Sequence, residues 1–234
     1  MRTLLGLSLA LIFLGARTPL PNDLIVAAVF APHKSNISMY WRDAQGKDYR
    51  NIGRLKSDME RQGRTLLFAL NGGMYTPEHA PVGLYVESGT QHRMLNTGKG
   101  GTGNFSMQPN GVFGMRKDGR AQVITTDAAR TVTDWHYATQ RGPMLVINGT
   151  INPQFTPGSR NLNIRNGVGI TTDGHVVFAI SKEPVNFHDF AVFFLDRGCT
   201  NALYLDGAVS RAYMPEAGLQ QLDGDLGVLI AVTR

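Results

Sequence analysis

Residues 203–210 read LYLDGAVS, an apolar run that ends abruptly in a carboxylate and a glycine, with a hydroxyl three residues later. The apolar run predicts a buried strand, and Asp206 then lies where the chain leaves the sheet. The rigid backbone at the end of a strand fixes the position of a carboxylate, which can then face a cleft. Catalytic and binding residues are often found at such junctions between a strand and a loop. Asp206 is therefore the first candidate for a functional residue.

A second stretch has the same form. Residues 65–70 read TLLFAL and run directly into Asn71-Gly72-Gly73-Met74-Tyr75. Paired glycines permit backbone angles and close approaches that side chains forbid. This junction between a predicted strand and a glycine turn is the second place where we expect functional groups.

The other local signals are hairpins and a few helices. Asp118-Gly119 and Asp173-Gly174 each lie between two apolar runs, which is typical of a tight hairpin turn. Helical spacing of apolar residues, with a glycine at the end, predicts helices within residues 52–63 and 186–198. These elements predict an α+β fold, a single domain over residues 20–234 with mixed or antiparallel β-sheets and two or three flanking helices.

The N-terminus predicts a targeting signal. Met1-Arg2 is followed by an apolar stretch over residues 4–14 and then by Gly15-Ala16, so we assign residues 1–16 to a signal peptide. The stretch is too short to span a bilayer, although an uncleaved short anchor is the alternative. We therefore expect a periplasmic or secreted protein with no stable membrane span after signal cleavage. Its one cysteine, Cys199, cannot form an internal disulfide and is expected to be structural.

Composition restricts the partners. With 234 residues, 42% hydrophobic and 18% charged, the chain can bury the core of an ordinary globular domain. The net charge of +5 is spread along the chain without a basic run, so it favours anionic ligands weakly and predicts no nucleic-acid partner. The six histidines show no paired metal spacing, so we expect neither a metal site nor a cofactor.

Four motifs occur in a particular order. They are Asn71-Gly72-Gly73-Met74-Tyr75, the segment 140–149 (QRGPMLVING), the segment 165–169 (RNGVG) and the segment 205–210 (LDGAVS). In this order they resemble the phosphodiester glycosidase family, and the likeness covers about residues 24–232. The mammalian branch of that family removes N-acetylglucosamine from a phosphodiester.

The chain departs from that branch at two motifs. Ala208 and Val209 stand where the mammalian branch has further glycines, and Asn166 stands where it has threonine. The resemblance implies the family's fold and a glycosyl phosphodiester as substrate, whereas the departures leave the sugar open.

The implied chemistry needs two kinds of group. Removing a sugar from a phosphodiester builds positive charge at the anomeric carbon and leaves a phosphomonoester. Asp206 could act at the sugar as nucleophile, base or charge stabiliser. Arg165 and Arg141 are the candidates for the phosphate, because a guanidinium matches phosphate oxygens in pairs. Glu183, at the end of an apolar run, is the second candidate for a catalytic carboxylate.

Further groups are expected to bind the substrate. Glycine-rich turns supply N–H donors for anions, asparagine amides bind sugar hydroxyls or orient a carboxylate, and an aromatic ring can stack on a sugar face. The glycine-rich segment 97–104 is expected to be a loop near the site. The predicted substrate-binding residues are Asn71, Gly72, Gly73, Tyr75, Asn104, Arg141, Gly142, Gly207 and Ser210.

These residues give one leading hypothesis and two alternatives. The first is an exported hydrolase that cleaves a glycosyl phosphodiester of envelope polymers or extracellular glycans. A non-catalytic envelope-glycan binding module would keep the aromatic and amide contacts but tolerate the loss of Asp206. A metal-dependent phosphodiesterase would need clustered Asp and His ligands, which the spacing does not display. The sequence leaves open the sugar, the partner of Asp206, the retaining or inverting outcome and the oligomeric state.

Overall fold

A computed structural model describes residues 24–98, 103–207 and 209–234. The predicted signal peptide therefore lies outside the described residues, as do the middle of the glycine-rich segment and Ala208. Within the described ranges, none of the helices has the length and apolar character needed to cross a membrane.

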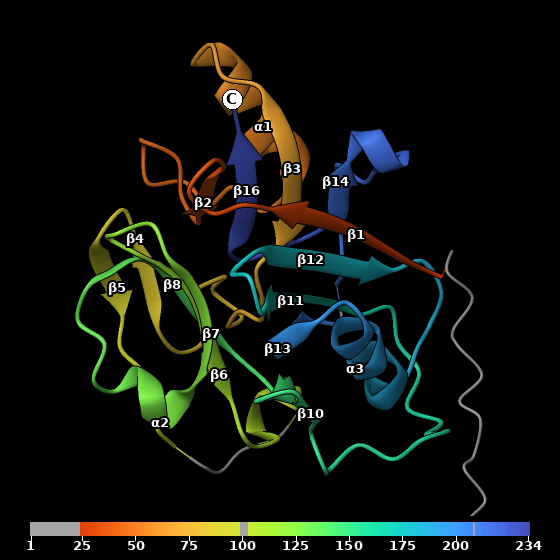
Figure 1. Ribbon diagram of the computed structural model, residues 1–234. Coiled ribbons are helices and arrows are strands. Elements are labelled where there is room, and N and C mark those ends of the chain that lie inside the picture. Colours follow the sequence, from red (N-terminus) through yellow and green to blue (C-terminus); the bar gives the residue numbers. More distant parts are fainter. Residues whose placement is uncertain (1–23, 99–102, 208) are drawn as a thin grey trace, which may run out of the picture.

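The strands of the described residues form three antiparallel sheets, here called A, B and C (Figure 1). Sheet A has the order β1 (Ile25–Phe30), β12 (Val176–Ser181), β11 (Asn166–Thr171), β13 (Cys199–Asp206), β9 (Met144–Ile147) and β10 (Thr150–Ile151). Sheet B has the order β15 (Leu219–Gln220), β14 (Ala212–Met214), β3 (Leu66–Asn71), β16 (Leu229–Thr233) and β2 (Asn36–Tyr40). Sheet C has the order β5 (Thr90–Arg93), β4 (Tyr85–Glu87), β8 (Trp135–Arg141), β6 (Gly111–Arg116) and β7 (Ala121–Thr125).

The helices accompany these sheets. In the described ranges they are α1 (Ile52–Arg61), α2 (Thr126–Ala129) and α3 (Phe187–Asp196), with short 3₁₀ turns at Asn104–Ser106 and Pro215–Ala217. The prediction of an α+β fold with a single domain and flanking helices is confirmed. Both predicted hairpins are present, as β6 with β7 and β11 with β12.

Local sequence explains where the two longer helices begin. The side chain of Asn51 accepts a hydrogen bond from the N–H of Arg54 and caps α1, and the side chain of Asn186 caps α3 through the N–H of Asp189 at 2.8 Å. Such caps satisfy N–H groups that have no partner within the helix. Gly198 follows α3 with a φ of 74°, which favours glycine at the end of a helix.

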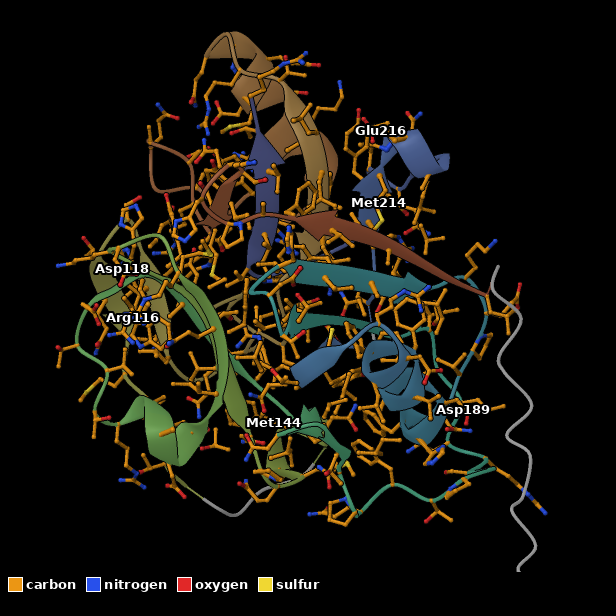
Figure 2. The ribbon with its side chains drawn as sticks, viewed as in Figure 1. Arg116, Asp118, Met144, Asp189, Met214 and Glu216 are labelled. Carbon is orange, nitrogen blue, oxygen red and sulfur yellow. The ribbon has the colours of Figure 1, made fainter. Side chains whose placement is uncertain are left out.

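Aromatic side chains join the three sheets in one core. Phe68 of sheet B stacks on Phe178 of sheet A with ring centroids 4.9 Å apart, and Phe113 of sheet C meets Phe178 edge to face at 5.5 Å. Met144 and Met214, which lie far apart in Figure 2, belong to the same buried cluster. The core therefore fixes the three sheets relative to one another.

The two longer helices close the outer faces. A row of phenylalanines on α3 packs with Cys199 and Tyr204 of β13 in a second buried cluster. Ile52, Leu55 and Met59 of α1 pack in a third cluster beside β3 (Figure 1). This packing holds the ends of β13 and β3 rigid, and these strands end in the two stretches singled out in the sequence.

Candidate active site

Three asparagine and aspartate side chains meet where sheets A and B adjoin. Asn71 ends β3, Asp206 ends β13, and Asn166 begins β11 opposite Asp206. Asn71 Nδ2 donates to Asp206 Oδ2 at 3.2 Å, and Asn166 Nδ2 donates to Asn71 Oδ1 at 2.6 Å and to Asn71 O at 2.9 Å. Asp206 N donates to Asn166 Oδ1 at 2.7 Å. The carboxylate is thus held by two sheets at once.

The hydrogen-bond pattern fixes the orientation of both amides. Asn71 Oδ1 also accepts from Arg211 N at 2.9 Å, so its NH₂ group must face Asp206. Gly207 N donates to Asp206 Oδ1 at 2.7 Å, and Ser210 Oγ donates to Asp206 O at 3.0 Å. Each carboxylate oxygen of Asp206 therefore accepts an N–H, an arrangement that suits an ionised carboxylate.

Arg141 brings a buried positive charge from sheet C. It ends β8 with no exposed surface, and its Nε donates to Gly72 O at 2.8 Å. Its Nη1 donates to Val82 O at 2.7 Å and to Gln140 O at 2.6 Å. Burial lowers the pKa of Arg141 to about 10, and the negative charge of Asp206 partly opposes that shift. Arg141 is therefore charged at neutral pH and lies in the field of Asp206.

One nitrogen of the Arg141 guanidinium, Nη2, has no hydrogen-bond acceptor in the described part of the chain. A buried donor without an acceptor costs free energy, and functional sites are where such groups are often found. Arg141 Nη2 is suited to an anionic ligand atom.

The glycines make room for this side chain. Gly73 has a φ of 134°, and a Cβ there would lie 1.4 Å from Arg141 Nε. A Cβ at Gly142 would lie 2.1 Å from Asn110 Oδ1. The prediction that turn amides bind the anion needs correction at two positions, because Gly72 N donates to Val228 O and Gly207 N donates to Asp206. Gly72 instead contributes its carbonyl to Arg141.

Arg165 precedes Asn166 in the chain, and two of its three guanidinium nitrogens bond groups outside this cluster. Arg165 Nε donates to Val185 O at 2.8 Å, and Nη2 donates to Asn161 O at 2.8 Å. The guanidinium carbon lies 3.6 Å from the ring centre of Phe187 and 5.4 Å from that of Tyr204. Burial lowers the pKa of Arg165. Its Nη1, like Nη2 of Arg141, has no hydrogen-bond partner in the described part of the chain.

Tyr204 connects Arg165 with the carboxylate. It precedes Asp206 by two residues on β13, and its hydroxyl accepts from Asn104 Nδ2 at 3.3 Å. A Cβ at Gly207 would lie 1.9 Å from this hydroxyl, so glycine is needed there. Burial raises the pKa of Tyr204 well above its usual range, and Arg165 opposes that shift. Asn104, one of the predicted substrate-binding residues, thereby contacts Tyr204.

Tyr75 lies on the loop that follows β3. It is half-buried, its hydroxyl donates to the backbone oxygen of Asp225, and its ring stacks on His79 with centroids 4.7 Å apart. Burial raises the pKa of Tyr75, and the negative charges of Asp225 and Asp206 raise it further. Tyr75 therefore lies within the electrostatic reach of the candidate carboxylate.

Two other sequence candidates lie apart from this group. Glu183 is exposed in the turn after β12, and in the described residues no hydrogen bond or ion pair joins it to Asp206. Cys199 is buried, and burial raises the pKa of its thiol to about 12, so it remains a protonated structural residue. A search of residues 24–98, 103–207 and 209–234 for three or more clustered His, Cys, Asp or Glu side chains that could hold a metal ion finds none.

Sequence reasoning missed two members of the group. Asn166 belongs to one of the four motifs, but its side chain was not singled out. Tyr204 was assigned to the apolar strand before Asp206. The alternation of side chains along a strand places residues 204 and 206 on one face, and this signal could have identified Tyr204.

Comparison with known proteins identifies the family of this chain. Residues 64–226 match the phosphodiester glycosidase family, and the chain belongs to that family. It is 38% identical over 195 residues to the uncharacterized protein YigE of Escherichia coli strain K12, an alignment that covers 83% of this chain and 76% of YigE.

Two solved structures share the fold. One is the catalytic domain of zebrafish N-acetylglucosamine-1-phosphodiester alpha-N-acetylglucosaminidase, auto-inhibited by its pro-peptide, with a TM-score of 0.62, 16% identity and coverage of 93% of this chain and 84% of that one. The other is a Burkholderia pseudomallei protein, with a TM-score of 0.60, 11% identity and coverage of 89% and 73%. At these identities the likeness shows the fold alone.

Proposed function

We propose that this protein is an exported hydrolase that cleaves a sugar from a glycosyl phosphodiester. Family membership supports a hydrolase of this kind. One observation carries the assignment of residues: Asp206, bonded by Asn71 and Gly207, lies in the field of a buried, charged Arg141 whose Nη2 has no acceptor in the described part of the chain. The site thus joins a carboxylate for the sugar with a cation for the phosphate.

In this proposal Asp206 acts at the anomeric carbon. The bond from that carbon to the bridging oxygen breaks, and its electron pair leaves with the phosphomonoester. The Asp206 carboxylate stabilises the positive charge that develops on the sugar. Water supplies a hydroxyl to the anomeric carbon and releases a proton to solvent.

Arg141 and Arg165 act at the phosphate in this proposal. A phosphate leaving group is a weak base and needs little protonation, so donors that stabilise its charge can replace a general acid. Arg141 Nη2 and Arg165 Nη1 are two buried donors that find no acceptor among the described residues, and they are the candidates for the phosphate oxygens. Asn104 bonds the Tyr204 hydroxyl and Arg165 lies 5.4 Å from the Tyr204 ring, so in this proposal these two polar side chains orient the bridging oxygen.

The test is the hydrolysis of an activated sugar-1-phosphodiester in ¹⁸O-labelled water. Attack at the sugar places ¹⁸O on the released sugar, whereas a phosphodiesterase places it on the phosphate. We expect label on the sugar, activity that survives a chelator, and a loss of kcat of roughly 10²- to 10³-fold in Asp206→Asn. Asp173→Asn, on an exposed hairpin, is the matched control.

The alternatives give different results in the same experiment. Label on the phosphate together with sensitivity to a chelator would identify a metal-dependent phosphodiesterase. Glycan binding without turnover, unchanged in Asp206→Asn, would identify a non-catalytic module. Either result rejects the proposed hydrolase.

A further inference from the structure

The loop that follows β3, residues 72–82, is here called the arm, and both of its ends accept hydrogen bonds from Arg141. Gly72 O and Val82 O, at the two ends of the arm, both accept from this guanidinium. Within the arm, Thr76 N donates to Ala80 O at 2.9 Å, and a β-bridge joins Tyr75 to Pro81. Tyr75 is therefore part of a loop whose two ends are both bonded to the buried cation.

Tyr75 is held in place by a cluster of three residues, which are His79, Asp225 and Arg50. Tyr75 and His79 stack with an angle of 17° between their planes, and His79 Nε2 lies 2.9 Å from Asp225 Oδ1. Arg50 Nη2 lies 2.7 Å from the same Asp225 oxygen, and the Tyr75 hydroxyl donates to Asp225 O. Asp225 thus ties the arm to the segment before β16.

The backbone of this cluster is unusual. Arg50 has a φ of 61° and His79 a φ of 58°, values that non-glycine residues seldom adopt. Trp41 Nε1 donates to His79 O at 2.9 Å, and Leu226 N donates to Arg50 O at 2.6 Å, so surrounding bonds hold both residues in place. Strained residues that are held in this way gather at functional sites.

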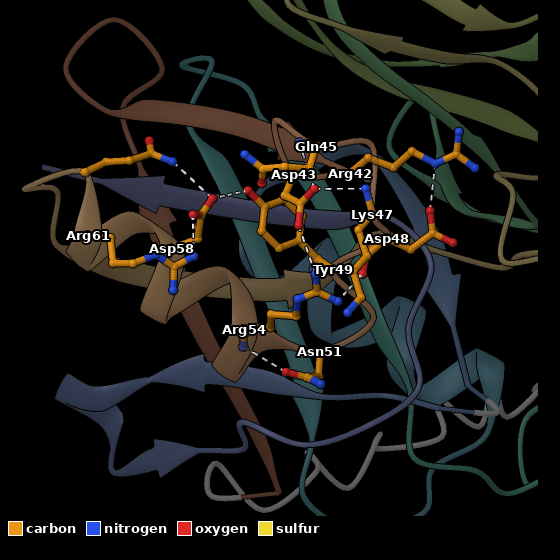
Figure 3. Close-up of polar contacts among 11 residues, drawn as sticks. Arg42, Asp43, Gln45, Lys47, Asp48, Tyr49, Asn51, Arg54, Asp58 and Arg61 are labelled. Carbon is orange, nitrogen blue, oxygen red and sulfur yellow. Dashed lines mark hydrogen bonds and ion pairs between the residues drawn. The ribbon is translucent and has the colours of Figure 1, made fainter.

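The segment that carries Arg50 is itself fastened to α1. Figure 3 shows its ion pairs and hydrogen bonds on both sides of residue 50. Arg54 Nη2 lies 2.9 Å from Asp43 Oδ2, and Tyr49 OH donates to Asp58 Oδ2 at 2.5 Å. A continuous set of contacts therefore connects Tyr75, through Asp225 and the segment around Arg50, with helix α1.

We infer that His79 and Asp225 are positioning residues for Tyr75, and that the ring of Tyr75 receives the sugar half of the substrate. This inference rests on the proposed function. The Tyr75 hydroxyl is engaged by Asp225 O, so the ring offers the site an apolar surface, which suits the C–H face of a sugar. The negative charge of Asp225, whose backbone oxygen accepts from the Tyr75 hydroxyl, disfavours a phosphate there.

Close packing confines the ring further. A Cβ at Gly227 would lie 3.0 Å from the ring atom Cδ1 of Tyr75, so Gly227 packs against the ring edge while His79 stacks on the ring. Loss of His79 removes one of these bounds without touching Arg141 or Asp206. The sugar half of the site should therefore weaken while the phosphate half remains.

The experiment compares binding of N-acetylglucosamine and inorganic phosphate by calorimetry in the unaltered protein and in two variants. His79→Ala loses the stack and the bond to Asp225, whereas His79→Phe keeps the stack. We expect His79→Ala to weaken N-acetylglucosamine about 3- to 10-fold, the range of an aromatic contact, with phosphate affinity changed less than about 2-fold. His79→Phe should restore most of the sugar affinity.

The control is His136→Ala, which removes a histidine that contacts Tyr137 on sheet C, with centroids 4.6 Å apart. Equal weakening of sugar and phosphate in His79→Ala, unchanged sugar affinity, or no sugar binding by the unaltered protein would each overturn the inference. Turnover is measured separately on the same samples. Sugar binding that depends on His79 in a protein without turnover would reject the proposed hydrolase and keep the role of His79.

Discussion

The side chain of Asn166 connects sheets A and B next to the carboxylate of Asp206. Its NH₂ group bonds the carbonyl and the side-chain oxygen of Asn71 in sheet B, while its own oxygen accepts from Asp206 N in sheet A. An aspartate in its place would bring a second negative charge next to Asp206, and a leucine would bond neither strand. The amide is suited to this position because it donates and accepts at once.

We predict that Asn166→Ala weakens both folding and catalysis. The substitution leaves the buried Asn71 O and Asp206 N–H without their partner, and each such group costs about 1–3 kcal/mol. The free energy of unfolding, measured with urea, should fall by about 2–4 kcal/mol. The kcat should fall while the KM changes little, because Asp206 loses its orientation. A stable variant with unaltered kcat would contradict the role given to this residue.

For single residues, the sequence predicts which polar residues lie at the ends of strands, but it does not predict the direction of a long side chain. Asp206 and Asn71 were recognisable because an apolar run stops at a polar residue. The direction of Arg165, toward Asn161 and Val185, depends on a loop that returns from elsewhere in the chain. Glu183 follows a strand as Asp206 does, but no second element covers it, so it is exposed.

Among the elements, the arm after β3 is the most sensitive to small changes. Gly73 combines a φ of 134° with contact to the Arg141 side chain, so an added methyl group would both strain the backbone and displace the guanidinium. Gly149 is a matched glycine, because it has a φ of 76° but nothing within 4 Å of an added Cβ. The pair separates backbone strain from displacement of Arg141.

We predict that Gly73→Ala abolishes phosphate binding and lowers the free energy of unfolding by more than about 2 kcal/mol, since it adds overpacking to strain. Gly149→Ala should cost only about 1 kcal/mol and leave binding intact. Calorimetry with inorganic phosphate and urea unfolding measure the two effects. Equal behaviour of the two variants would show that contact with Arg141 is unimportant.

Elements with local signals were predictable, and their arrangement was less so. The caps of α1 and α3 and the two Asp-Gly hairpins depend on neighbours within a few residues. The order of sheet B, in which β3 lies between β14 and β16, pairs segments more than a hundred residues apart. No local pattern encodes such pairings, and the family resemblance was what carried the expectation that the four motifs act together.

For the whole molecule, stability should decline in acid. The pKa of Asp173 is lowered to about 2, first by the hydroxyl of Thr171 and then by His175. Hydrogen bonds and cations likewise lower the pKa values of five other carboxylates, which are Asp43, Glu78, Asp118, Asp223 and Asp225. A carboxylate with a lowered pKa in the folded state contributes stability above its unfolded pKa, near 4, and loses it as the pH falls through the folded value.

We predict that Tm is steady down to about pH 4 and then drops toward pH 2. The Tm difference between the unaltered protein and Asp173→Asn should shrink over the same window, because protonation removes what the substitution has already removed. Thermal unfolding followed by circular dichroism between pH 7 and pH 2 measures both. A constant difference down to pH 2 would refute the contribution of this carboxylate.

The core and the candidate site share one property, since each draws on sheets A, B and C. Asp206 comes from the first, Asn71 from the second and Arg141 from the third. A chain in which any two sheets had assembled without the third would lack one of these three residues at the candidate site. The proposed turnover would thus begin only at the last stage of maturation and vanish at the first stage of damage, so that an activity assay would report on structural integrity.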